Sequence, residues 1–136
     1  MSMRSGLTIG ASREEHYKVT KELSIQVGGV AVLSTPSLVN LIEHTSRLLL
    51  APYLQEDEQS VGSSINVKHI APTPVGGDLR VVSRVTGISG RRVDFTVEAY
   101  DQAEKVGEAA HQRYVVELSK FQQRVEQKLK PSSNMV

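Results

Sequence analysis

Apolar residues in the stretch 33–51 recur at spacings of three and four, the period of a helix with one buried face. The sequence predicts this helix over residues 37–51. At 1.5 Å per residue it is about 22 Å long, which suits a core helix and is too short to cross a membrane. Thr35 is the predicted N-cap, Pro36 takes the first helical position, and Pro52 ends the helix. The apolar face is made of Leu38, Leu41, Ile42, Thr45, Leu48 and Leu49.

The rest of the chain mostly alternates apolar and polar residues, which predicts β-strands. A half-buried strand is expected over residues 17–27, although Lys21 interrupts its pattern. Four more strands are predicted, at 61–69, 78–88, 93–99 and 106–118. Short turns between strands make neighbours antiparallel. The predicted class is therefore α+β, with a five-stranded antiparallel sheet wrapped around one long central helix. A short amphipathic helix follows, with an apolar stripe of Phe121, Val125 and Leu129.

At 136 residues the chain is expected to form a single domain, 1–136, with flexible ends at 1–15 and 130–136. The net charge is +1 and no strongly basic face is evident, so no nucleic-acid partner is expected. The absence of cysteine excludes disulfides, zinc ribbons and thiol nucleophiles. No stretch has the length and apolarity of a signal peptide or a membrane span. We therefore expect a cytoplasmic protein with no membrane partner.

One acid, Glu43, lies inside the apolar run of the predicted helix. An ionised carboxylate there is costly unless something pairs with it or it faces a wet cleft. One interpretation places Glu43 at the edge of the apolar stripe, where it reaches solvent. The other makes it a functional acid. The helix alone leaves both open.

His69 ends the predicted strand 61–69, on a face expected to include Val61, Ser63, Ile65 and Val67. A lone histidine on such a face is usually a satisfied core residue. An acid and a histidine that point from apolar faces into one region are better explained as partners, because pairing keeps the acid ionised. His69 is then the proton-transfer partner of Glu43, whose carboxylate acts as general base or as nucleophile.

Three further residues have a structural and a functional interpretation. Thr35 caps the helix, and the same position is the positive end of the helix dipole, where an oxyanion would be stabilised. Gly62 either eases strand packing or lets a ligand approach the backbone. Arg113 is either a surface ion-pair residue or a ligand for coenzyme phosphates. A metal site is not expected, because the remaining histidines lack metal-ligand spacing: His16, His44 and His111.

Four segments, in this order, resemble the hotdog-fold acyl-CoA thioesterases, and within them the fluoroacetyl-CoA thioesterase family. They are Val32-Leu-Ser-Thr-Pro-x-Leu-Val-x-Leu-Ile-Glu43, Val61-Gly-x-x-Ile-Asn-Val-Lys-His69-Ile-Ala-Pro-Thr-Pro-Val-Gly, Gly90-Arg-Arg-Val-Asp-Phe-Thr-Val-Glu-Ala-Tyr-Asp101 and Gly107-Glu-x-x-His-Gln-Arg113. Each motif is weak alone, but four of them with matching separations are fairly specific.

The resemblance implies a hotdog fold and a homodimer or higher oligomer with sites built across the subunit interface. It implies that Thr35, Glu43 and His69 form the catalytic group, and that Gly62 and Arg113 contact the substrate or the coenzyme. No cofactor is implied, because coenzyme A is part of the substrate. The fluoroacetyl enzyme carries aromatic residues in a lid before the central helix, but residues 24–34 contain none. Selectivity for fluoroacetyl groups is therefore not predicted.

The predicted function is the hydrolysis of a short-chain acyl-CoA thioester to the free acid and CoA. Two alternatives are kept. A hydratase of the same fold would need an Asp–His pair at other positions, which the sequence does not offer. A non-catalytic acyl-CoA-binding domain would not need the acid and the histidine, which are both present.

Overall fold

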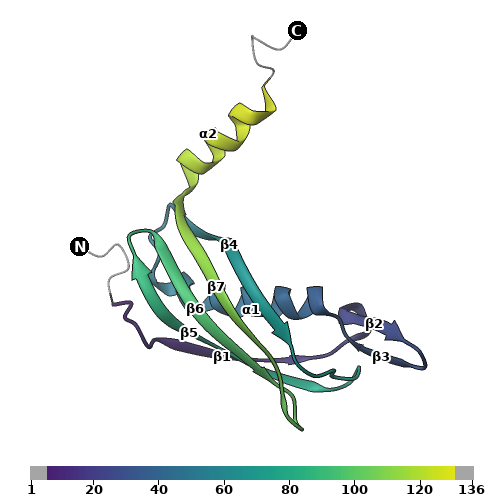
Figure 1. The fold of residues 1–136 in the computed structure, drawn as a ribbon. Coiled ribbons are helices and arrows are strands. Elements are labelled where there is room, and N and C mark those ends of the chain that lie inside the picture. Colours follow the sequence, from purple (N-terminus) through teal and green to yellow (C-terminus); the bar gives the residue numbers. More distant parts are fainter. Residues whose placement is uncertain (1–5, 131–136) are drawn as a thin grey trace.

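The computed structural model describes residues 6–130 and shows a curved sheet wrapped around one long helix (Figure 1). The sheet has five antiparallel strands in the order β1-β5-β6-β7-β4, which confirms the predicted α+β class and the central helix. Ser12–Glu15 belong to β1, and the expected flexible residues 1–5 and 131–136 lie outside the described part of the chain. The sheet is formed by β1 (Ser12–Lys18), β4 (Glu58–His69), β5 (Asp78–Ser89), β6 (Arg92–Tyr100) and β7 (Lys105–Glu117).

The core lies between the helix α1 (Thr35–Leu50) and the inner face of the sheet. Every second residue is buried from Leu79 to Val85 in β5 and along the whole of β6, as the alternation in the sequence predicts. The helix contributes Leu38, Ile42, Leu49 and Leu50, and the sheet contributes Val81, Val85, Val93, Phe95 and Val97, all almost fully buried. A short 3₁₀ turn, Ala51–Tyr53, continues from α1 and leads to β4.

The segment 17–27 is not one strand, and this prediction was wrong. β1 ends at Lys18, a 3₁₀ turn follows at Lys21–Leu23, and β2 (Ser24–Val27) pairs with β3 (Val30–Leu33) in a separate hairpin. The hairpin turns at Gly28, whose φ of +57° is a conformation that glycine adopts without strain. A Gly-Gly pair between two short apolar runs is a recognised signal for a two-residue hairpin, and this signal explains the break.

The start of α1 also differs from the prediction by one residue. Ser34, not Thr35, is the N-cap: its backbone is extended, and its Oγ accepts a hydrogen bond from the amide of Ser37 at 3.2 Å. Pro36 consequently lies at the second helical position rather than the first. Because Ser34 performs the capping, the hydroxyl of Thr35 is available for another partner.

The predicted C-terminal helix is confirmed as α2 (Leu118–Leu129), which projects away from the sheet in Figure 1. Its apolar stripe, Phe121, Val125 and Leu129, is exposed. Neither α2 nor any other helix of residues 6–130 combines the length and apolarity that a bilayer span requires.

Candidate active site

Thr35 and His69 meet where the first turn of α1 faces the end of β4. The Thr35 hydroxyl and Nδ1 of His69 share a hydrogen bond of 2.8 Å. Nε2 of His69 is buried and has no hydrogen-bond partner among the described residues. Burial lowers the pKa of His69 below its usual value, which favours the neutral imidazole near pH 7. A neutral imidazole with one uncommitted ring nitrogen is suited to proton transfer.

Glu43 lies two turns further along α1, opposite Gly62 and Arg113. One Glu43 oxygen is 3.9 Å from Nη1 of Arg113, and the Glu43 side chain is 37% exposed whereas that of Arg113 is 6% exposed. A Cβ at position 62 would overlap this Glu43 oxygen, and it would lie 3.5 Å from Nη1 of Arg113. Gly62 therefore makes room for the carboxylate, and the exposed fraction of Glu43 leaves it open to solvent or a ligand.

Two hydrogen bonds to Ser60 on β4 hold the Arg113 guanidinium in place. Its Nε donates to Ser60 Oγ at 2.9 Å, and its Nη2 donates to the Ser60 carbonyl at 3.1 Å. Burial lowers the pKa of Arg113 while Glu43 raises it, and a guanidinium stays charged in either case. The interpretation of Arg113 as a surface ion-pair residue does not hold, because the side chain is buried beneath the Glu43 carboxylate.

His111 was not singled out from the sequence, yet it belongs to this cluster. Its Nδ1 lies 2.8 Å from the Ser64 carbonyl and its Nε2 lies 3.3 Å from Nη1 of Arg113. Ser60 was missed in the same way. The available signal was position: on β7, His111 and Arg113 are two residues apart and so share one face of the strand.

A bulge in β4 decides which of its residues face the site. The register shifts between Gly62 and Ser64, so that Gly62 pairs with Arg113 while Ile65 pairs with His111. Directly paired residues share a face, which places Gly62 and Ile65 on the inner side although they are three apart. Ile65, Val67 and His69 face inward as predicted. Val61 pairs with the exposed Tyr114, so its predicted inner position was wrong.

The five predicted site residues form two groups within one chain. The first group is Thr35 with His69 at the start of α1, and the second is Glu43 with Gly62 and Arg113. Thr35 and Glu43 are eight residues apart on one helix, about 12 Å along its axis. Among the described residues, the ionic partner of Glu43 is Arg113 and the hydrogen-bond partner of His69 is Thr35. The predicted pairing of Glu43 with His69 is therefore not formed within the described part of a single chain.

An apolar groove of about 310 Å³ leads to the first group. Thr35 and His69 lie in it, and most other side chains around it are aliphatic. They come from the β2–β3 hairpin and from the segment after β4: Ile25, Val27, Val32, Leu33, Ile70, Ala71 and Pro72. Aliphatic walls around a polar pair suit an uncharged hydrocarbon group attached to a reactive carbonyl.

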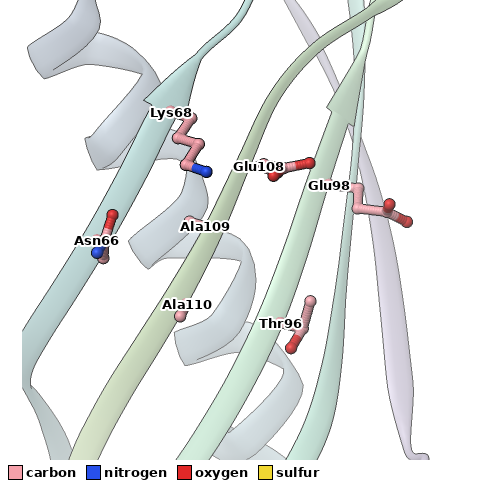
Figure 2. A pocket seen from close by; sticks show the side chains of 7 residues that line it. All are labelled: Asn66, Lys68, Thr96, Glu98, Glu108, Ala109 and Ala110. Atoms are coloured by element: carbon pink, nitrogen blue, oxygen red, sulfur yellow. The ribbon is translucent and has the colours of Figure 1, made fainter.

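A second hollow, of about 360 Å³, lies on the outer face of the sheet (Figure 2). Lys68, Glu98 and Glu108 line it, and both glutamates receive hydrogen bonds from Lys105. The sheet separates this hollow from α1, as Figure 2 shows, so it is not connected to Thr35 or Glu43. Within residues 6–130 no three histidine, aspartate or glutamate side chains are grouped to hold a metal ion.

Comparisons with known proteins show which family this chain is similar to. The model of the family "Fluoroacetyl-CoA-specific thioesterase" matches residues 16–119. The fluoroacetyl-CoA thioesterase of Streptantibioticus cattleyicolor is 37% identical over 97 residues, which are 71% of this chain and 70% of that protein.

Solved structures extend the similarity to the fold. A structure of the fluoroacetyl-CoA thioesterase FlK has a TM-score of 0.85 at 30% identity and covers 93% of this chain and 99% of its own. A hot-dog-like protein from Thermanaerovibrio acidaminovorans has a TM-score of 0.90 at 22% identity and covers 97% of this chain and all of its own. These neighbours confirm the predicted hotdog fold.

Proposed function

The chain belongs to the fluoroacetyl-CoA-specific thioesterase family and is an acyl-CoA thioesterase, and from this premise we propose that it hydrolyses short aliphatic acyl-CoA thioesters with Thr35, Glu43 and His69 as its catalytic group. The observation that carries the proposal is the Thr35–His69 hydrogen bond of 2.8 Å at the start of α1. It places a hydroxyl and an imidazole at the positive end of a helix dipole, in an apolar groove.

The thioester carbonyl is placed against Thr35. Pro36 has no N–H, and the amide of Ser37 already donates to Ser34 Oγ, so the backbone of this turn offers little to an oxyanion. The Thr35 hydroxyl is the side-chain donor at this end of the helix. A donor aimed at the developing negative charge lowers the barrier to attack on the carbonyl.

Glu43 starts the attack on the thioester carbonyl. Its carboxylate either removes a proton from water, which then adds to the carbonyl, or adds to the carbonyl itself to give an anhydride that water opens. In both routes the C–S bond breaks and the CoA thiolate takes up a proton. His69 relays this proton: Nε2, the ring nitrogen without a partner among the described residues, accepts the proton that the water gives up, through Glu43 in the first route, and passes it to the thiolate. The positive charge of Arg113 lies 3.9 Å from the Glu43 carboxylate and attracts it.

The complete site is assembled from two copies of the chain. Within one chain Glu43 and Thr35 are about 12 Å apart along α1, too far to act on one carbonyl. β4, with twelve residues, lies at one edge of the sheet that the described residues form, and such edges commonly pair with another strand. Pairing of two β4 edges around a two-fold axis gives a homodimer in which Glu43 of one subunit serves the Thr35–His69 pair of the other.

The acyl group is assigned to the groove beside the β2–β3 hairpin. Its walls are aliphatic, and the described residues around it contribute no charged side chain other than His69 when that residue is protonated. FlK variants have been solved with fluoroacetate and CoA and with acetyl-CoA, which supports a short acyl group as the substrate of this chain. Aliphatic side chains in place of the aromatic lid of the fluoroacetyl enzyme favour a short hydrocarbon chain in this protein.

A panel of acyl-CoA substrates tests the proposal, with CoA release followed by a thiol-detecting reagent. The panel runs from acetyl to hexanoyl and includes fluoroacetyl, branched and aryl thioesters. We expect turnover of the short aliphatic members, and light scattering is expected to give a dimer. Binding without turnover of any member would make the protein an acyl-CoA-binding domain, and hydration of an enoyl-CoA without CoA release would make it a hydratase. Either result would overturn the proposal.

A further inference from the structure

We propose that His111 is a positioning residue for the thioesterase reaction: its Nε2 lone pair holds the Arg113 guanidinium in the orientation that presents Nη1 to Glu43. This inference rests on the proposed function of Glu43. His111 does not touch the substrate in this account, because its residue surface is only 1% exposed. It acts through Arg113.

The hydrogen bonds fix the tautomer of His111. The Ser64 carbonyl can only accept, so Nδ1 of His111 must carry the proton of their 2.8 Å hydrogen bond. In the neutral ring Nε2 is then an acceptor, and Nη1 of Arg113 is the donor 3.3 Å away. Burial lowers the pKa of His111 and the Arg113 charge lowers it further, although the Ser64 hydrogen bond opposes the shift. A neutral acceptor therefore faces the guanidinium.

The bulge in β4 makes this arrangement possible. The strand register breaks between Gly62, which pairs with Arg113 on β7, and Ser64, which pairs with Gln112 next to His111. At a bulge the ladder is interrupted, so a backbone carbonyl there can accept from a side chain. The Ser64 carbonyl accepts from His111 in this way. The same bulge keeps Gly62 on the inner face, where the absent side chain leaves space for Glu43.

Nη1 is the nitrogen of Arg113 that faces both His111, which orients it, and Glu43, which it stabilises. Nε and Nη2 are both bound by Ser60, and these two bonds hold the guanidinium at one edge. Nη1 lies between Nε2 of His111 at 3.3 Å and the Glu43 oxygen at 3.9 Å. A separation of 3.9 Å is longer than a hydrogen bond, so Nη1 stabilises the carboxylate by charge without occupying its lone pairs. Those lone pairs stay available for water or for a carbonyl carbon.

Two substitutions of His111 each keep one of its two hydrogen bonds and remove the other. In His111→Gln the amide oxygen can reach the Nε2 position and accept from Arg113, while the bond to Ser64 is lost. In His111→Asn the shorter amide can reach the Nδ1 position and donate to Ser64, while Arg113 loses its acceptor. Both variants bury an amide of similar polarity, so each controls for the other. Melting temperature, kcat and KM are measured for both.

We expect His111→Asn to lower kcat about 10-fold or more, the scale of a misplaced catalytic group, with little change in KM. His111→Gln is expected to keep kcat within about 3-fold of the wild-type value. Equal values of kcat in the two variants, once corrected for the folded fraction, would overturn the inference, because His111 would then only fill space. A loss confined to His111→Gln would overturn it as well.

A measurement without turnover separates this inference from the proposed function. Nitrogen NMR of the imidazole in the wild-type protein reports which ring nitrogen carries the proton. We expect Nδ1 to be protonated and Nε2 to be bare and hydrogen bonded at pH 7. A proton on Nε2 would contradict the inference even in an active thioesterase. If the expected tautomer is found but the protein hydrolyses no thioester, the inferred geometry of His111 is supported and the proposed function is refuted.

Discussion

The two halves of the candidate site are built in opposite ways. Around Arg113 every guanidinium nitrogen has a neighbour, and the cluster is buried between β4 and β7. Around His69 one ring nitrogen has no partner, and the flanking groove is aliphatic and open at the hairpin. A saturated polar network holds one geometry, because any movement leaves a buried donor unpaired. An unsaturated pair can accept a reactant. In the proposed mechanism the first half positions the carboxylate, and the second binds the thioester.

The largest expected effect comes from Glu43→Gln. The substitution keeps the shape of the side chain and removes its charge, so kcat should fall about 100-fold or more, as for the loss of a positioned acid–base group. The melting temperature should change little, because the Glu43 side chain is partly exposed and Arg113 keeps its bonds to Ser60. Enzyme kinetics and thermal unfolding are measured on one preparation. A stable variant with full activity would remove Glu43 from the mechanism.

The neighbours Ser34 and Thr35 should separate stability from activity. Thr35→Ala removes the partner of His69 but not the helix cap, so kcat should fall about 10-fold with little change in stability. Ser34→Ala removes the cap and should lower the free energy of unfolding by about 1 kcal/mol with near-normal kcat. Denaturant unfolding and steady-state kinetics check both. The reverse pattern would mean that Thr35 is only structural.

Gly62→Ala tests the space beside the carboxylate. The added Cβ would overlap a Glu43 oxygen, and the partly exposed Glu43 side chain can move away. We expect kcat to fall about 10-fold, since a displacement of about 1 Å is costly at a reacting group, with only a modest change in melting temperature. Ser63→Ala, at the exposed neighbouring position, is the matched control and should keep full activity. Unchanged kcat in Gly62→Ala would show that the carboxylate need not lie there.

The smallest effect is a dependence of stability on pH. Burial lowers the pKa of both His69 and His111 below the ordinary histidine value of 6.5. The unfolded chain then binds protons at a higher pH than the folded chain does, so stability is complete above about pH 6.5 and falls as the pH drops below it. His111→Gln removes one of the two contributions, and its melting temperature should fall less between pH 7 and pH 5 than that of the wild type. Parallel curves for the two proteins would contradict this.

Much of this arrangement follows from local patterns in the sequence. The helix and four of the five strands follow from apolar periodicity, and Glu43 stands out as a charge in an apolar run. The β4 bulge does not follow, because alternation assumes an unbroken ladder, so Val61 was placed on the wrong face. His111 and Ser60 were missed because their importance depends on bonds to Arg113 across strands. The cap moved to Ser34 because two adjacent hydroxyl residues compete for one role.

The central claim is that Glu43 and the Thr35–His69 pair act on one thioester from two different chains. Mixing Glu43→Gln with His69→Gln, each inactive alone, tests it most directly after the subunits have exchanged. Each mixed dimer then holds one site with Glu43 and His69 both intact. Random exchange should restore on the order of a quarter of wild-type turnover, because half of the dimers are mixed and each of these has one working site. No recovery, in a sample shown to contain mixed dimers, would contradict the account.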